Sequence, residues 1–380
     1  MTRVVVIGAG MAGLSAAYYL ERRAGEQGVD LEMTVLDPNA WLGGKVRTET
    51  HDGTVIEAGP DSYISQKPWA TQLIRELGIE DQIIASRDHL QRVCVVDRRR
   101  LVPFPKGFRL AIPTEWKPFL LTRLISPLGK ARMACDVLIP RKADDADESL
   151  ASFIRRRLGD EALQKMAGPM MAGIYSGDPE DMSVLATFPM FVEMEQKHGS
   201  LIRAMLQTRT RAPSPKAGNH PGGMFLSMRD GMRALPEAVG AALRADIRLQ
   251  RSAQSIRRDG DQYAVRASDG EERIADQVVI ATPAGVAAEL LRDLAPGVAG
   301  RLDAIRHLST ATLSLRYPRD GFTALRDGVG PGFIVPLREQ QTLTACTFSS
   351  CKFAHRTGDD SVLLRAFVGG PRNSEQVGLP

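Results

Sequence analysis

The chain opens with an unbroken run of β-branched apolar residues, Val4 to Ile7, that leads directly into glycine. A short run of this kind predicts a parallel strand buried on both faces. Residues 14–27 follow with apolar side chains on one side of a helix, which predicts an amphipathic helix. A second apolar run at residues 31–36 predicts the next strand. This succession of strand, turn, helix and strand indicates an α/β fold.

The middle of the chain has a different pattern. Residues 81–216 predict helices interrupted by prolines, so we expect an inserted helical subdomain. Alternating apolar and polar residues return over residues 247–281, where Asp259-Gly260 and Asp269-Gly270 have the composition of hairpin turns. We expect these strands to rejoin the first sheet, which makes that domain discontinuous.

The turn after the first strand has the G-x-G-x-x-G spacing, formed by Gly8, Ala9, Gly10, Met11, Ala12 and Gly13. In this spacing the first glycine permits the turn, the second lets backbone approach a pyrophosphate, and the third lets helix pack on strand. Asp37 ends the second strand, where a carboxylate can accept hydrogen bonds from ribose hydroxyls and repels a 2′-phosphate. Together these features predict a dinucleotide site. The alternative is an ordinary glycine turn.

NAD and FAD both bind to this unit, so the choice between the two cofactors depends on the segment that follows. Directly after the acidic residue, Leu42 to Thr48 contains the adjacent glycines Gly43 and Gly44. These permit a second close backbone approach beside the phosphate loop, which nicotinamide dehydrogenases do not need. The segment therefore favours FAD.

This arrangement resembles the flavoprotein superfamily that includes amine oxidases, phytoene desaturases and protoporphyrinogen oxidases. Lys45 stands where that superfamily usually has arginine, which keeps the charge but not the guanidinium fork. The segment at residues 53–68 is similar to the next FAD contact of the superfamily. The resemblance implies that FAD is bound by the G-x-G-x-x-G loop, by Asp37, Gly44 and Lys45, by the backbone of Glu57, Ala58, Gly59 and Pro60, and, at the adenine, by the backbone of Ala253.

Later segments narrow the resemblance. The glycine- and proline-rich residues 168–179, which we expect to form a loop with free backbone groups, precede residues 186–189 and 195–202. These segments are similar to the protoporphyrinogen oxidase family, which includes the flavin- and oxygen-dependent coproporphyrinogen III oxidases. The similarity continues at residues 231–235, 276–283 and 367–370. It therefore spans essentially the whole chain.

The resemblance implies an α/β fold with a discontinuous Rossmann-like FAD-binding domain, a mixed-sheet substrate domain and an inserted helical subdomain. We expect the FAD-binding parts at residues 1–80 and 217–305, the helical insertion at 81–216 and substrate-domain strands at 306–380. The family's C-terminal flavin segment has no counterpart before Pro380. We expect a fragment of a longer protein; the alternative is a shortened homologue with an incomplete flavin site.

The implied activity is FAD-dependent oxidation of a porphyrinogen, protoporphyrinogen IX or coproporphyrinogen III, to the porphyrin in haem biosynthesis, with O₂ reduced to H₂O₂. The six histidines are scattered and no metal-binding spacing occurs, so we assign no catalytic side chain and no metal. The chemistry is left to the cofactor. Substrate contacts implied by the resemblance fall on Arg92, Lys67, Gly173, Ile334 and Phe348. A surface position for Arg92, and core packing for Ile334 and Phe348, are the alternatives.

Two other functions remain open. One is an FAD amine oxidase or carotenoid desaturase, against which residues 168–179 and 195–202 argue. The other is a non-catalytic flavin- or porphyrin-binding protein, suggested by the missing C-terminal flavin segment.

Composition limits the partners. Lysine and arginine number 49 against 45 acidic residues, a net charge of +4, which predicts no nucleic-acid partner. No apolar run is long enough for a membrane span, no leader precedes the first strand, and four cysteines lack metal-like spacing, so we expect a cytoplasmic protein. Residues 116–139 mix bulky apolar residues with cations, as in a helix face on the core or a peripheral membrane contact. A homodimer is also open.

Overall fold

The computed structural model describes residues 1–87, 93–105, 108–109, 112–113, 116–175, 177–209, 223–322, 330–339, 342–370 and 374–378. The chain divides into two compact units. Unit 1 joins Met1–Ser86 with Pro221–His307, and unit 2 joins Arg87–His220 with Leu308–Pro380. Each unit is therefore built from two separate stretches of sequence.

A four-stranded parallel sheet forms the centre of unit 1. Its order is β12 (Asp246–Leu249), β2 (Leu31–Asp37), β1 (Thr2–Ile7) and β16 (Gln277–Ile280). The predicted first strand lies between two neighbours, and Ile7 pairs with Leu36 on one side and Ile280 on the other. This central position is why the opening run is apolar throughout.

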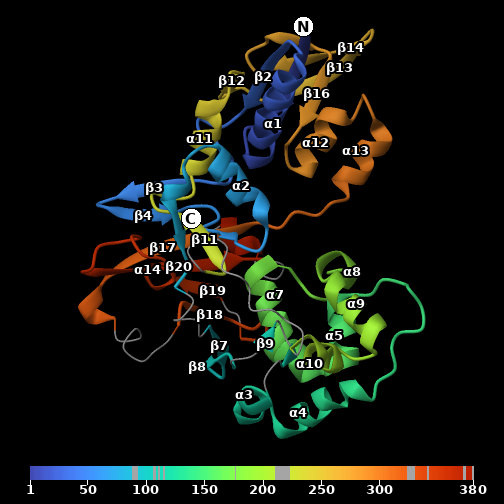
Figure 1. Ribbon diagram of the computed structural model, residues 1–380, viewed down its shortest axis with the longest axis vertical. Coiled ribbons are helices and arrows are strands. Elements are labelled where there is room, and N and C mark those ends of the chain that lie inside the picture. Colours follow the sequence, from blue (N-terminus) through green and yellow to red (C-terminus); the bar gives the residue numbers. More distant parts are fainter. Residues whose placement is uncertain are drawn as a thin grey trace. The chain divides into compact units, whose positions relative to one another are not determined.

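Alternate residues of β1 enter two different cores, because successive side chains of a strand point to opposite faces. Val4 and Val6 pack with Leu14 of α1 (Met11–Gln27), on the face that also holds α11 (Ala234–Ala242). Val5 and Ile7 pack against a second sheet on the other face. Figure 1 shows α1 lying along the parallel strands. Unit 1 is thus layered around β1.

The second sheet consists of β13 (Ala253–Asp259), β14 (Gln262–Ala267) and β15 (Glu272–Ala275). The predicted hairpins are confirmed, with Gly260 and Gly270 at positive φ in the two turns. The expectation that all these strands rejoin the first sheet is wrong. Only β12 and β16 do so, because the hairpin strands bury one face against β1 and leave charged residues on the other.

Unit 1 also contains five short strands and three further α-helices. These are β3 (Thr48–His51), β4 (Thr54–Glu57), β5 (Tyr63–Ile64), α2 (Pro68–Glu76), β6 (Ile83–Ala85), β11 (Phe225–Met228), α12 (Ala284–Leu291) and α13 (Pro296–Asp303). β3 and β4 form a hairpin, and β11 lies between β5 and β6.

Unit 2 contains a six-stranded mixed sheet. Its order is β17 (Thr310–Pro318), β20 (Ser361–Gly369), β19 (Leu343–Phe348), β18 (Gly332–Ile334), β7 (Cys94–Asp97) and β8 (Arg100–Pro103). All described pairs are antiparallel except β18 with β7. Two further strands, β9 (Phe108–Arg109) and β10 (Ile112–Pro113), pair with each other, and α14 (Ser349–Lys352) follows β19.

The helices of unit 2 surround one apolar core. They are α3 (Trp116–Leu121), α4 (Pro127–Ala134), α5 (Leu150–Leu158), α6 (Asp160–Ala162), a π-helix (Leu163–Ala167), α7 (Gly168–Tyr175), α8 (Val184–Thr187), α9 (Pro189–His198) and α10 (Leu201–Arg209). Phe153 and Phe191 stack in that core with centroids 6.2 Å apart. Among the described residues after 82, the first helix begins at Trp116, and residues 83–85, 94–97, 100–103, 108–109 and 112–113 form short strands. The expectation of helix is wrong for those strands. Within the described helices, none has the length and apolar character needed to cross a bilayer.

Candidate cofactor site

The first glycine loop begins where β1 ends. Gly8 has φ +107°, and a Cβ placed on Gly13 would lie 1.8 Å from the carbonyl oxygen of Gly8. A Cβ on Gly8 would meet the carbonyl oxygen of Ala281 at 2.8 Å. Both positions therefore require glycine for the strand, turn and helix to pack.

Gly10 has a different environment. A Cβ there would meet no described atom within 4 Å, so glycine at this position keeps a space open. Gly10 is the N-cap of α1 and no side chain caps the helix, while Met11 and Ala12 form its first turn. The N–H groups and dipole of such a helix terminus favour a phosphate. This is the arrangement that a pyrophosphate needs.

The second glycine loop lies directly against the first. The N–H of Gly43 donates to the carbonyl of Ala9 at 2.8 Å, and Gly10 and Gly43 form a parallel bridge. A Cβ on Gly44 would lie 3.2 Å from the Cα of Gly10. Lys45 follows with an exposed side chain. Two predicted cofactor segments therefore lie together, with a cation beside them.

The third predicted segment, residues 57–60, lies beside this loop. A Cβ on Gly59 would come 1.7 Å from the carbonyl oxygen of Lys45, and the N–H of Ala58 donates to the carbonyl of Arg47 at 2.9 Å. Ala58 and Pro60 are exposed, whereas Glu57 is buried. The close backbone contact explains the glycine, and it brings this segment next to Lys45.

Asp37 has a partner that the sequence did not suggest. One carboxylate oxygen accepts the N–H of Ala9 at 2.7 Å, and the other accepts both N–H groups of Asn39 at 2.8 Å. The residue is 4% exposed. Asp37 thus holds the phosphate loop in place. The oxygen that accepts from Ala9 has a further lone pair, which a ribose hydroxyl could use, and this role of Asp37 stays a prediction.

Ala253 is brought to the same edge of the parallel sheet by backbone contacts. The N–H of Arg251 donates to the carbonyl of Asp37 at 2.9 Å, and the N–H of Gln250 donates to that of Asn39 at 3.0 Å. Ala253 then begins β13 and packs in the core that contains Leu36. Its contact with the adenine stays a prediction.

The site fits FAD on three observations: the space kept open at Gly10, the uncapped N-terminus of α1, and the packing of three backbone segments around them. It lies where parallel strands end, the usual position for nucleotides in α/β sheets. FAD would be held by both glycine loops and Lys45, with the segment at 57–60 beside them. Bound there, it would supply the hydride-accepting chemistry that the described side chains lack.

The predicted substrate residues are distributed over both units. Arg92 lies outside the described residues. Lys67 is exposed in unit 1 at the N-cap of α2. Gly173 lies in the last turn of α7, where helical geometry leaves backbone carbonyls for partners outside the helix. The prediction of a loop at residues 168–175 is wrong. Pro169 falls in the first turn, where proline is compatible with a helix.

Ile334 and Phe348 lie on neighbouring strands of unit 2 but face opposite ways. Ile334 pairs with Ala345, whereas Phe348 shares the face of Cys346. Phe348 is 3% exposed and packs edge-on against Phe333, with centroids 6.3 Å apart. A ligand lying on one face of this sheet could therefore reach only one of the two predicted side chains.

Residues 168–179 also border a pocket of about 290 Å³ in unit 2. Gly168, Pro169, Arg155 and Arg338 are among the residues that line it. Both arginines are already paired: Arg155 with Glu180 at 2.6 Å, and Arg338 with Asp97 at 2.7 Å. The pocket is therefore not a free cationic site.

A buried ionic network in unit 2 was not predicted. Arg157 and Asp136 have fully buried side chains, and Nε of Arg157 lies 2.6 Å from the Asp136 carboxylate. Arg157 also donates to the carbonyls of Ile139 and Gly199, at 3.0 and 2.8 Å. Asp136 accepts the Ser200 hydroxyl at 2.5 Å. The pair is thus fully surrounded by hydrogen-bonding partners, as a buried charge requires.

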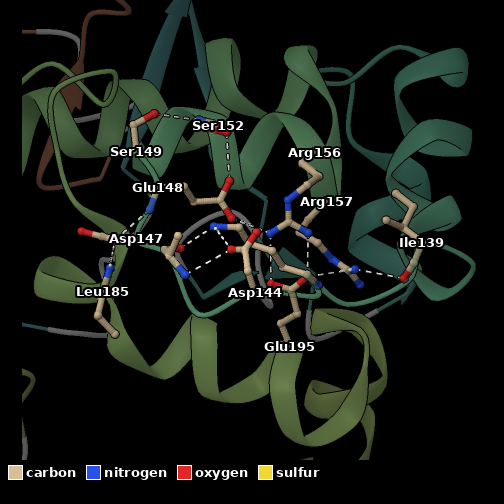
Figure 2. Close-up of polar contacts among 12 residues, drawn as sticks. Ile139, Asp144, Asp147, Glu148, Ser149, Ser152, Arg156, Arg157, Leu185 and Glu195 are labelled. Atoms are coloured by element: carbon tan, nitrogen blue, oxygen red, sulfur yellow. Dashed lines mark hydrogen bonds and ion pairs between the residues drawn. The ribbon is translucent and has the colours of Figure 1, made fainter.

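Arg156 and Glu195 extend this network (Figure 2). Arg156 makes two hydrogen bonds to Glu195, at 2.6 and 3.0 Å, and a third to Glu148 at 2.6 Å. Burial opposes ionisation of Glu195, but the hydrogen bond and charge of Arg156, with the charge of Arg157, lower its pKa overall. Part of the family-like segment at residues 195–202 therefore has a structural role. No spacing in the sequence links it to Asp136.

Comparisons with known proteins identify the family of this chain. The family model described as flavin containing amine oxidoreductase matches residues 11–380. The chain is 34% identical to coproporphyrinogen III oxidase of Bacillus subtilis (strain 168), over 99% of this chain and 79% of the relative. It is 28% identical to protoporphyrinogen oxidase 1, chloroplastic, of Arabidopsis thaliana, over 98% of this chain and 70% of that one.

Solved structures give the same result. A protein from Exiguobacterium sp. 255-15, provisionally named protoporphyrinogen oxidase, has a TM-score of 0.86 and 34% identity, covering 100% of this chain and 79% of its own. A putrescine oxidase variant with redesigned cofactor binding has a TM-score of 0.66 at 16% identity, covering 100% of this chain and 77% of its own, and shares the fold. The α/β FAD-binding fold is therefore confirmed. The chain belongs to the family of flavin-containing amine oxidoreductases and is an FAD-dependent oxidoreductase.

Proposed function

We propose that this protein oxidises a porphyrinogen to the corresponding porphyrin in haem biosynthesis. The observation that carries the proposal is the 34% identity to a coproporphyrinogen III oxidase over nearly the whole chain. The Arabidopsis relative named protoporphyrinogen oxidase is less similar, at 28% identity, but the Exiguobacterium protein provisionally given that name is as similar, at 34%. Coproporphyrinogen III and protoporphyrinogen IX are therefore both substrates to test.

The acceptor proposed is O₂. Each two-electron oxidation removes a hydride and a proton from the macrocycle and reduces one O₂ to one H₂O₂, so atoms and electrons balance. The described side chains suggest no general acid or base for this step. The task of the protein is to hold the cofactor and the donor carbon in place and to keep the site dry.

Substrate binding is proposed for the residues that the family resemblance implies. The carboxylates of a porphyrinogen need cationic partners, and Arg92 suits them because guanidinium binds a carboxylate through two hydrogen bonds. Lys67 is a further cation, and the carbonyl of Gly173 is a candidate acceptor for a pyrrole N–H. Either Ile334 or Phe348 would contact the apolar ring.

Peripheral membrane contact is proposed for the exposed side chains of residues 116–139 in unit 2. Phe119, Leu124, Ile125 and Met133 are buried in its core, which supports the core interpretation of residues 116–139. Other leucines of this segment are exposed by 63 to 84%: Leu120, Leu121, Leu128 and Leu138. Lys117 and Arg123 are exposed beside them in the sequence, and no acidic residue occurs between residues 117 and 135. Apolar side chains with cations suit an anionic lipid surface.

Flotation with vesicles of anionic phospholipid tests this contact. We expect the protein to float and the L121E/L128E variant to stay at the bottom. Leu185 is also an exposed leucine, on α8, and L185E is the matched control. Equal flotation of all three proteins would remove the proposal. The homodimer stays a prediction, for which sedimentation equilibrium is the measurement.

Oxygen uptake tests the reaction itself. The full-length protein, reconstituted with FAD, should consume O₂ and release H₂O₂ with coproporphyrinogen III or protoporphyrinogen IX, and the ratio of kcat/KM values identifies the better substrate. We expect R92A to raise KM chiefly. R258A, at an exposed position of β13, should leave KM unchanged. Turnover of amines or carotenoids with no turnover of porphyrinogens would overturn the proposal.

A further inference from the structure

Glu57 begins the third predicted cofactor segment, and its side chain is a buried carboxylate that faces away from solvent. Thr48 and Glu57 are paired across the β3–β4 hairpin, and they are 3% and 5% exposed. The Thr48 hydroxyl donates to one carboxylate oxygen of Glu57 at 2.6 Å. A carboxylate at this depth is costly unless donors surround it. The other donor to Glu57 comes from outside the hairpin.

Glu57 and Thr48 each accept a hydrogen bond from the turn that leads into α11. The N–H of Met232 donates to the second carboxylate oxygen of Glu57 at 2.9 Å, and the N–H of Arg233 donates to the Thr48 hydroxyl at 3.1 Å. Gly231 has φ +98°, and a Cβ there would lie 2.2 Å from the Thr48 methyl carbon. The hairpin therefore fixes the start of α11 through two side chains.

The helix carries this restraint to the second glycine loop. A Cβ on Gly43 would lie 2.7 Å from the ring of Pro236, and a Cβ on Gly240 would lie 2.3 Å from the Leu42 side chain. These contacts place α11 directly against Leu42 and Gly43. Gly43 in turn donates to Ala9, at the phosphate loop.

We propose that Thr48 and Glu57 are positioning residues for FAD. Through α11 they hold the Gly43–Gly44 turn against Gly10, so that the cofactor meets a loop already in its bound conformation. Preorganisation of this kind raises affinity because binding then orders fewer groups. The inference rests on the FAD site and is independent of which substrate is oxidised.

Titration of the apoprotein with FAD, followed by flavin fluorescence, tests the proposal through a matched pair of variants. T48V removes the hydroxyl at nearly constant volume, whereas T48S keeps it. We expect T48V to raise the FAD dissociation constant about tenfold and T48S to change it less than about threefold. E57Q should weaken FAD binding as T48V does. Glutamine has one acceptor oxygen in place of two, so it cannot accept from both the Thr48 hydroxyl and the Met232 N–H.

E49Q is the control for charge, since Glu49 lies on the same hairpin with its side chain 38% exposed. Circular dichroism of each apoprotein shows whether the variant is folded, and only folded variants enter the comparison. Equal FAD affinity of T48V, T48S and wild type would overturn the proposal, as would equal loss in T48S and T48V. Because no porphyrinogen is present, neither result depends on the proposed function.

Discussion

The N–H of Gly43 and the carbonyl of Ala9 are joined by a hydrogen bond of 2.8 Å, which connects two glycine loops separated by the whole of α1 and β2. Ala9 also donates its own N–H to Asp37. One residue of the phosphate loop is therefore held from two sides. These two hydrogen bonds fix the loop, and Gly10 is the position in it that leaves space for a ligand.

Gly10 and Gly13 should respond differently to alanine. G13A places a Cβ 1.8 Å from the carbonyl oxygen of Gly8, so we expect the free energy of unfolding to fall by about 3 kcal/mol or more. G10A adds a methyl group in open space, so the apoprotein should stay folded while FAD affinity falls at least about tenfold. Thermal melts and FAD titrations separate the two effects. Unchanged FAD affinity in G10A would show that the cofactor does not approach this residue.

Trp41 supports the second glycine loop from its exposed side. Its indole N–H donates to the carbonyl of Gly44 at 3.0 Å, and the guanidinium of Arg47 lies 4.6 Å from the ring centroid. W41F keeps an aromatic side chain but loses the N–H donor, so we expect FAD to bind about two- to fivefold more weakly. W69F, on the exposed side of α2, is the control. Equal affinity in both variants would exclude this support.

The buried pair of unit 2 should dominate its stability. R157L leaves Asp136 buried without its charge partner, and we expect the free energy of unfolding to fall by about 3–5 kcal/mol. R155Q, on the same helix but 45% exposed, should cost no more than about 1 kcal/mol. Urea denaturation of both variants provides the comparison. A small effect of R157L would mean that the network contributes little to folding.

Glu195 should make stability depend on acid pH. Its pKa is lower in the folded protein than the ordinary value of 4.5. The stability contributed by the ionised form is therefore present above that value and is lost as the pH falls through the lower, folded pKa. We expect E195Q to show a weaker fall of unfolding free energy below pH 4.5 than wild type. Parallel pH profiles of the two proteins would contradict this assignment.

The four thiols should differ in reactivity. Burial raises the pKa of Cys346 to about 11 and also raises those of Cys94 and Cys351, whereas Cys135 is exposed. Because the thiolate is the nucleophile, alkylation at neutral pH should modify Cys135 first. Mass spectrometry of the partly alkylated protein identifies the site. Early labelling of Cys346 would show that its strand opens readily.

The sequence predicted the parts of the fold that depend on local pattern. The strand at Val4–Ile7, the glycine turn and the first helix are confirmed, because apolar periodicity and glycine spacing directly reflect their packing. The hairpin turns at Gly260 and Gly270 are confirmed for the same reason. Which sheet each strand joins was harder to predict. β13 to β15 form a separate sheet, and this pairing depends on tertiary packing.

Features that depend on distant contacts were missed. The helix at Gly168–Tyr175 follows a π-helix, in a segment whose glycines and proline predicted a loop. Met171 there is buried in the core, and tertiary packing outweighs the local preference. The pairing of Arg157 with Asp136, and that of Glu57 with the start of α11, join residues far apart in the chain. The periodicity of apolar residues along the sequence does not indicate which distant residues pair.

An anaerobic mixing experiment tests the central claim most directly. The full-length protein reconstituted with FAD is mixed with coproporphyrinogen III without oxygen, and flavin absorbance and porphyrin fluorescence are followed together. FAD-dependent oxidation of a porphyrinogen predicts that the flavin absorbance bleaches while porphyrin fluorescence rises at the same rate. No bleaching with either coproporphyrinogen III or protoporphyrinogen IX, in a sample shown to hold FAD, would contradict it.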